Sequence, residues 1–100
     1  MKTEISSQSS YTEIRLEGRF DHSSTREFRG AVMEAMRHGP AELRVDLAAV
    51  DYIDSAALGM LLMAKEMAET ASKTVTLANA KDMVGKVLEF AKFKVIFKIV

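Results

Sequence analysis

Alternation of hydrophobic and polar residues predicts the strands of this chain. Leu43, Val45 and Leu47 alternate with Arg44 and Asp46, which is the period of a strand with one covered face. Similar patterns recur along the sequence, with a turn at 8–10 and a last, short strand in the tail. The predicted strands cover residues 2–7, 11–19, 42–47, 74–78 and 93–100.

Helical spacing predicts a helix that opens with the capping box Ser24-Thr25-Arg26-Glu27. Gly39, in a left-handed conformation, and then Pro40 are expected to end it. Its buried face should comprise Phe28, Ala31, Val32, Ala35 and Met36.

Two further helices are predicted downstream, over 56–70 and after Asn79, which we expect to cap the last one. The last helix should bury a stripe of Met83, Val84, Val87, Leu88 and Ala91. The strand 42–47, helix 56–70 and strand 74–78 should form a parallel, right-handed βαβ unit. We therefore expect a single α/β domain over 1–100, with a mixed sheet of four or five strands and the main helices packed on one face.

The chemistry of the chain is concentrated where the central strand leads into helix 56–70. Asp54 is a good N-cap, and Ile53 and Leu58 have the spacing of a hydrophobic staple. Ser55 is then the first helical residue, with its hydroxyl in solvent. A phosphate on this hydroxyl would lie at the positive end of the helix dipole and would add about two negative charges. Taken alone, an Asp-Ser pair at a helix start is most often only a cap.

The surrounding sequence resembles the STAS domains (sulfate transporter and anti-sigma factor antagonist), in particular their anti-sigma factor antagonist branch. The signature is a hydrophobic strand with Asp-Leu, a loop of hydrophobic residues and Asp, and Asp-Ser-x-Gly-Leu-Gly. It is similar to three segments of this chain: 45–47, 50–53 and 54–59. Residues 16–21 resemble the family's Gly-x-hydrophobic-Asp turn, and residues 87–90 resemble its last helix. Ala57 stands where the family usually has Gly, and its methyl could hinder a partner's backbone.

The resemblance implies a phosphorylation-controlled switch. The unphosphorylated domain would bind an anti-sigma factor or a serine kinase of the histidine-kinase-like ATPase fold. Phosphorylation of Ser55 would end that binding, and a metal-dependent serine phosphatase would restore it. The implied partner surface comprises Asp21, His22, Ser23, Asp54, Ser55, Ala56, Ala57, Leu58, Gly59 and Met60.

The expected topology and the composition of helix 56–70 indicate which residues of that surface should lie together and face outward. The turn 20–23 should lie near Ser55, because sites in such folds gather at the carboxyl ends of parallel strands. The first half of helix 56–70 is apolar nearly all round, so some residues are expected to face outward. We expect Met60 to share an exposed patch with Asp21, Ser55 and Leu58, the alternative being that a neighbouring helix covers the methionines.

Composition argues against several other classes of protein, including nucleic-acid-binding, membrane and metal-binding proteins. Lysine plus arginine and aspartate plus glutamate number 14 each, so no net charge favours nucleic acid or an anionic membrane. There is no cysteine, no signal peptide and no apolar run long enough to cross a bilayer, which indicates a cytoplasmic protein. His22 and His38 lack the spacing of metal ligands, and no cofactor motif is present.

Three other interpretations of the sequence are open. Lysines beside Phe93 and Phe97 could stack nucleic-acid bases, but a lysine-blunted edge strand explains them better. A hydrolase using Ser55 lacks the Gly-x-Ser-x-Gly elbow and a general base, so we expect no enzyme. A non-phosphorylated STAS subunit that docks on a transporter ATPase stays an alternative, against which the intact Asp54-Ser55 pair argues.

Overall fold

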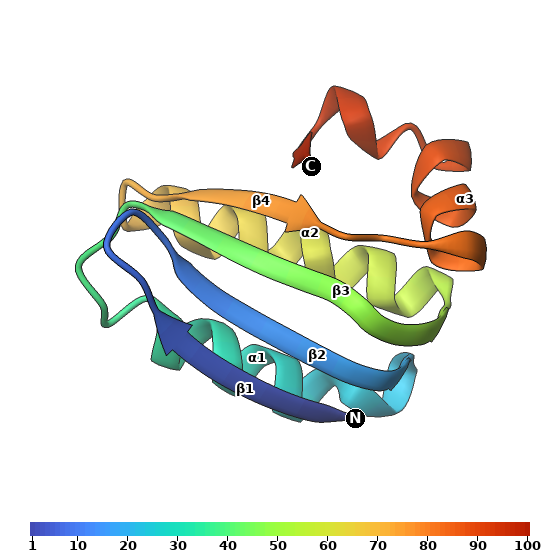
Figure 1. Cartoon of the computed structure of the whole chain (residues 1–100), viewed down its shortest axis with the longest axis horizontal. Coiled ribbons are helices and arrows are strands. Elements are labelled where there is room, and N and C mark those ends of the chain that lie inside the picture. Colours follow the sequence, from blue (N-terminus) through green and yellow to red (C-terminus); the bar gives the residue numbers. More distant parts are fainter.

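A five-stranded mixed sheet forms the centre of the computed structural model, which describes residues 1–100. Neighbouring strands follow chain order; β1 is antiparallel to β2, and all other neighbours are parallel. The strands are β1 (Lys2–Ser7), β2 (Thr12–Phe20), β3 (Glu42–Ile53), β4 (Thr74–Ala78) and β5 (Lys98–Ile99) (Figure 1). The predicted mixed sheet is confirmed, as is the parallel pairing of 43–47 with 74–78.

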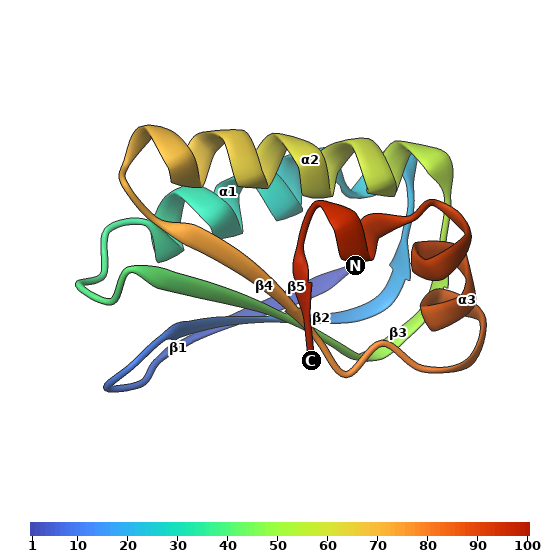
Figure 2. The same ribbon diagram turned by 90° about the horizontal axis from the view of Figure 1, so that it is seen from above.

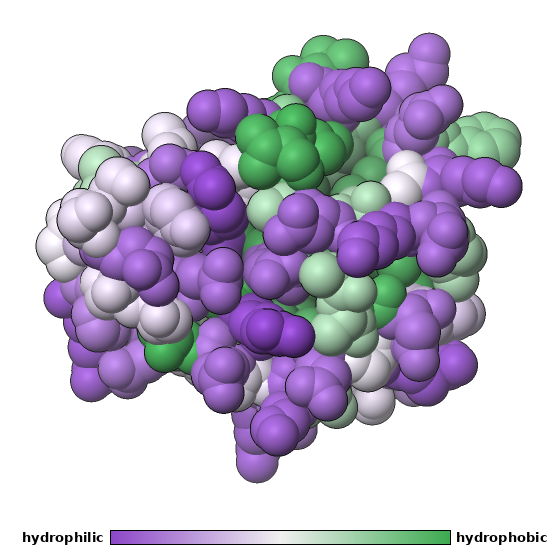
Figure 3. Space-filling view, viewed as in Figure 1, coloured by the Kyte–Doolittle hydropathy of each residue, from purple (hydrophilic) through white to green (hydrophobic).

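The helices lie mainly on one face of this sheet. α1 (Thr25–Ala35) and α2 (Ser55–Thr70) lie side by side over it, whereas α3 (Asp82–Phe90) is at the end of the sheet (Figure 2). Two short 3₁₀ helices, η1 (His22–Ser24) and η2 (Phe93–Val95), complete the chain. The opposite face is mainly hydrophilic (Figure 3). The expected arrangement of helices is therefore confirmed.

The core lies between the sheet and the α1–α2 layer. The inward residues of the central strands alternate as predicted. The rings of Phe20 and Phe28 pack against each other, with their centroids 4.9 Å apart. Full burial of each such side chain contributes about 1.5–3 kcal/mol. Side chains that are at most 1% exposed include Ile14, Leu16, Phe20, Phe28, Val32, Leu43, Val45, Leu47, Leu61 and Leu77.

β3 is longer than predicted, because it continues to Ile53 where we expected a loop after residue 47. Its register against β2 shifts twice, so β3 carries two residues more than β2 between the first and last pairs. Asp46 stabilises the first bulge: one carboxylate oxygen accepts from the Ala48 amide at 3.0 Å and from the Asn79 side chain at 3.2 Å. Such bulges interrupt the alternation from which the strand was predicted.

The ends of α1 differ from the prediction. The capping box lies at Asp21–Ser24 around η1, and Ser24 makes no capping bond to α1. The Ser24 hydroxyl is occupied, since it accepts from the Asp21 amide and donates to the Arg19 carbonyl. α1 ends at Ala35 in a right-handed turn, and Gly39 is not left-handed.

The C-terminal region differs more strongly from the prediction than α1 does. Asn79 does not cap α3; its backbone has a φ of +62°, and its amide donates to the Val100 carbonyl at 3.0 Å. Met83, predicted to be buried, is 38% exposed. The tail, predicted to be a strand over 93–100, begins as a 3₁₀ helix over Phe93–Val95, buries Phe93 and Phe97, and contributes only two residues to β5.

Candidate functional site

Ser55 lies at the start of α2, directly after the single residue that follows β3. Asp54 caps the helix: it is extended, and its Oδ1 accepts from the Ala57 amide at 2.9 Å. The Asp54 carbonyl accepts from the Leu58 amide at 3.2 Å and closes the first turn. Ser55 is exposed, and its hydroxyl has no protein hydrogen-bond partner. The cap and the position of Ser55 are confirmed.

The turn after β2 contacts this helix start, as the topology predicted. The other carboxylate oxygen of Asp54, Oδ2, accepts from the His22 amide at 3.2 Å, across 32 residues of sequence. It also lies 3.8 Å from Nδ1 of the exposed His22 ring. Asp54 therefore joins two distant segments, with one oxygen for each.

Asp21 adds a second carboxylate to the same turn. Its Oδ1 accepts from the Ser23 hydroxyl at 2.6 Å and from the Ser23 amide at 3.0 Å. These hydrogen bonds lower the pKa of Asp21, and Arg19, 3.5 Å away, lowers it further. The Arg19 guanidinium also stacks on Tyr52, 3.9 Å from the ring centre. Asp21 is therefore ionised at neutral pH, and a phosphate on Ser55 would join two existing negative charges.

The predicted partner surface is only partly accessible. Its members His22, Ser23, Ser55, Ala56 and Gly59 are exposed, whereas Asp21, Asp54 and Leu58 are partly exposed.

Two members of that surface face inward. Met60 is 6% exposed and belongs to the core, so the prediction that it faces outward is wrong. α2 packs on the sheet and against α1, which explains the apolar residues around its first half. The alternative, that a neighbouring helix covers the methionines, describes Met60 better. Ala57 is fully buried, so its methyl group fills core space and cannot meet a partner.

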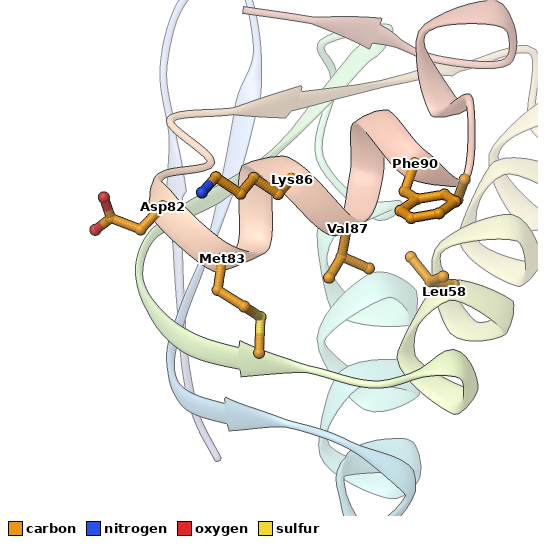
Figure 4. Close-up of a pocket in the computed structure, with 7 residues that line it drawn as sticks. Leu58, Asp82, Met83, Lys86, Val87 and Phe90 are labelled. Atoms are coloured by element: carbon orange, nitrogen blue, oxygen red, sulfur yellow. The ribbon is translucent and has the colours of Figure 1, made fainter.

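A groove that was not predicted from the sequence lies beside this helix start. It has a volume of about 680 Å³ between α2 and α3. In Figure 4, Leu58 of α2 faces Val87 and Phe90 of α3, and Met83 extends along the same side. Phe90 is 90% exposed. The spacing of Met83, Val87 and Phe90 was available as a signal, but we assigned Met83 and Val87 to a buried stripe that did not include Phe90.

Residues 3–98 match the family model described as "Mlab, STAS domain". The chain thus belongs to the STAS domain family, which confirms the resemblance. A STAS-domain containing protein of Pseudomonas aeruginosa is 38% identical over 86 residues, covering 86% of this chain and 84% of that protein.

Solved structures share the fold. An anti-sigma factor antagonist from Mycobacterium paratuberculosis has a TM-score of 0.85 at 15% identity, covering 98% of this chain and 83% of that one. The anti-sigma factor antagonist SpoIIAA in its unphosphorylated form has a TM-score of 0.79 at 19% identity, covering 99% and 88%.

SpoIIAA of Bacillus in its phosphorylated form has a TM-score of 0.71 at 18% identity, covering 99% of this chain and 91% of that one. A sulfate transporter family protein from Wolinella succinogenes has a TM-score of 0.73 at 16% identity, covering 89% and 75%. At these identities the likeness shows the fold alone. None of the helices here is both long enough and apolar enough to cross a membrane.

Proposed function

We propose that this chain is a phosphorylation-regulated anti-sigma factor antagonist in a bacterial partner-switching module. The observation that supports this most is the exposed Ser55 hydroxyl at the capped N-terminus of α2. Family membership and the fold shared with anti-sigma factor antagonists give the site its context. The unphosphorylated form binds an anti-sigma factor or serine kinase, hereafter the regulator, and phosphorylation of Ser55 blocks this binding. The switch acts in the cytoplasm as a binding protein without catalytic activity.

The site can accept a phosphate without unfolding. A negative charge at a helix N-terminus gains about 0.3–1 kcal/mol from the helix dipole. The carboxylates of Asp21 and Asp54 in the same region oppose it, so the net effect on the fold is expected to be smaller than the dipole contribution alone. SpoIIAA has been solved with this fold in both forms, which supports the same behaviour here. The loss of affinity then arises at the interface, where about two added charges meet a surface fitted to a neutral hydroxyl.

The regulator implied by this function is a serine kinase of the histidine-kinase-like ATPase fold. It would transfer the terminal phosphoryl group of ATP to the Ser55 oxygen, releasing ADP and a proton. A metal-dependent serine phosphatase would hydrolyse the phosphoserine and regenerate the binding form. His22 and Ser23 belong to the turn that contacts Asp54, the residue before Ser55. Both enzymes would therefore meet the side chains of His22 and Ser23.

The test combines phosphosite mapping with calorimetry, using the regulator encoded beside this gene. Incubation with that kinase and ATP should phosphorylate Ser55, identified by mass spectrometry. Ser55→Ala should bind the regulator as tightly as the wild type, whereas Ser55→Asp should bind at least about tenfold more weakly. Ser10→Ala is the control, since Ser10 is an exposed serine in the turn between β1 and β2, outside the proposed partner surface; it should leave phosphorylation intact. Phosphate found only at Ser23, or equal affinities for all Ser55 variants, would refute the proposal.

The alternative function is that of a STAS subunit that docks on a transporter ATPase. The fold shared with the sulfate transporter family protein is consistent with this role. That role predicts no phosphate on Ser55 and no difference between Ser55→Ala and Ser55→Asp. The same experiment therefore distinguishes the two functions.

A further inference from the structure

Exposed hydrophobic side chains are concentrated in the last fifth of the chain. Seven large ones are exposed in the whole domain, and five of these lie between residues 83 and 100. They are Met83, Phe90, Val95, Ile96 and Val100. Met83 and Phe90 line one groove, and exposed apolar side chains gathered at a groove are typical of sites of protein interaction.

The groove between α2 and α3 has the shape to hold a helix. Met83, Val87 and Phe90 follow the i, i+4, i+7 spacing and form one wall, and Leu58 of α2 forms the other (Figure 4). Along α3 these positions span ~10 Å, which is about two turns of an α-helix. An amphipathic helix presents apolar anchors at the same spacing and commonly docks in such grooves.

The charge around the groove specifies the polar side of its occupant. Residues 79–100 contain five lysines and two acids, a net charge of +3, and the rest of the chain has a net charge of −3. Lys86 and Asp82 both line the groove, and Lys81 and Lys92 lie just beyond the two ends of α3, so three lysines stand against one acid at and beside the groove. None of these three lysines forms an ion pair within the domain. Acidic side chains beside the apolar stripe would complement this surface.

One residue that lines the groove, Leu58, lies close to the proposed switch. Leu58 follows Ser55 by three residues, so the two lie one above the other on the first turn of α2. A helix in the groove would therefore pass within one turn of the Ser55 hydroxyl. A phosphate there would face an acidic occupant and repel it.

We propose that this groove docks an acidic amphipathic helix of the regulator whose binding Ser55 controls, an inference that rests on the proposed function. Phe90 and Met83 contact its apolar side chains, and Lys86 pairs with its carboxylates. Release on phosphorylation then follows from like-charge repulsion between phosphoserine and this helix.

Calorimetric titration of the purified regulator tests the groove. Phe90→Glu should weaken binding at least about tenfold, as expected for a central aromatic contact, and Lys86→Glu should weaken it about two- to fivefold. The controls are Met33→Glu, at an exposed methionine of α1, and Lys2→Glu, at an exposed lysine of β1. Both should bind like the wild type. Phe90 is so exposed that its variant should melt at the wild-type temperature, which excludes misfolding as the cause.

Photo-cross-linking from a benzoylphenylalanine at position 90 identifies the occupant. The expected product is a regulator segment with helically spaced apolar residues and flanking acids. A cross-link to a second copy of this chain would overturn the proposal, as would binding of the wild type, but not Phe90→Glu, to phosphatidylglycerol vesicles.

The two proposals fail differently. If Phe90→Glu binds the regulator like the wild type while Ser55→Asp binds weakly, the groove is wrong and the proposed function stands. If Ser55→Asp binds like the wild type while Phe90→Glu binds weakly, the proposed function is wrong and the coupling between groove and Ser55 falls with it.

Discussion

Replacement of Asp54 should separate its two structural roles. Asp54→Ala removes the hydrogen bond to the Ala57 amide, a helix cap worth about 0.5–2 kcal/mol. It also removes the bond to the His22 amide, worth about 0.5–1.5 kcal/mol. We expect a total loss of about 1–3.5 kcal/mol in the free energy of unfolding. The melting temperature should fall by roughly 4–8 °C for each kcal/mol lost in a domain of this size.

Asp54→Asn is the informative companion. Its single carbonyl oxygen can keep the cap, since Asn caps helices about as well as Asp, but its NH₂ group cannot accept from His22. The loss should be about 0.5–1.5 kcal/mol. Ser55→Ala is the control, and we expect a change within about 0.5 kcal/mol.

Urea denaturation followed by circular dichroism measures these differences as shifts of the midpoint at constant slope. A loss below about 0.5 kcal/mol for Asp54→Ala would refute the reasoning, because neither bond would then stabilise the fold. An equal loss for Asp54→Asn and Asp54→Ala would show that the contact with His22 outweighs the cap.

Three further predictions concern stability. Met60→Lys should cost at least about 3 kcal/mol by urea denaturation, because it buries a charge in the core; a near-neutral change would place Met60 at the surface. Asp21 has a pKa lowered by folding, so it stabilises the fold above pH ~4 and loses this effect as the pH falls through the folded-state value. Asp21→Asn should therefore flatten the loss of stability in acid, and an unchanged pH profile would contradict this. Asp46→Ala leaves the Ala48 amide and Asn79 unpaired and should cost about 1–3 kcal/mol, with faster hydrogen exchange at Ala48; unchanged exchange would be evidence against a stabilising role for Asp46.

The sequence predicted best where structure depends on local periodicity. β1 and β4 have the predicted bounds, and α2 differs by one residue, because alternation and capping are set by neighbouring residues. The Asp54 cap and the approach of the turn at His22 were also predictable, from residue type and topology.

Errors arose where distant segments decide the outcome. Ser24 could have capped α1, but its hydroxyl is bound to Asp21 and Arg19. Asn79 could have capped α3, but Asp46 and Val100 bind it instead. In the same way, Met60 is buried because α2 is covered on two sides, which a single helix pattern cannot reveal.

The bulges of β3 also constrain how this segment can change in evolution. Insertions and deletions are usually tolerated in loops, but the path from Asp46 to Asp54 contains no loop. Removing one residue from a bulge would shift the end of the strand by one position and turn Ile53 from the core towards solvent. The residue preceding the helix would then no longer be Asp54 in its capping geometry. Among relatives that have a serine at the position of Ser55, the number of residues between Asp46 and Ser55 should therefore vary less than the residues themselves.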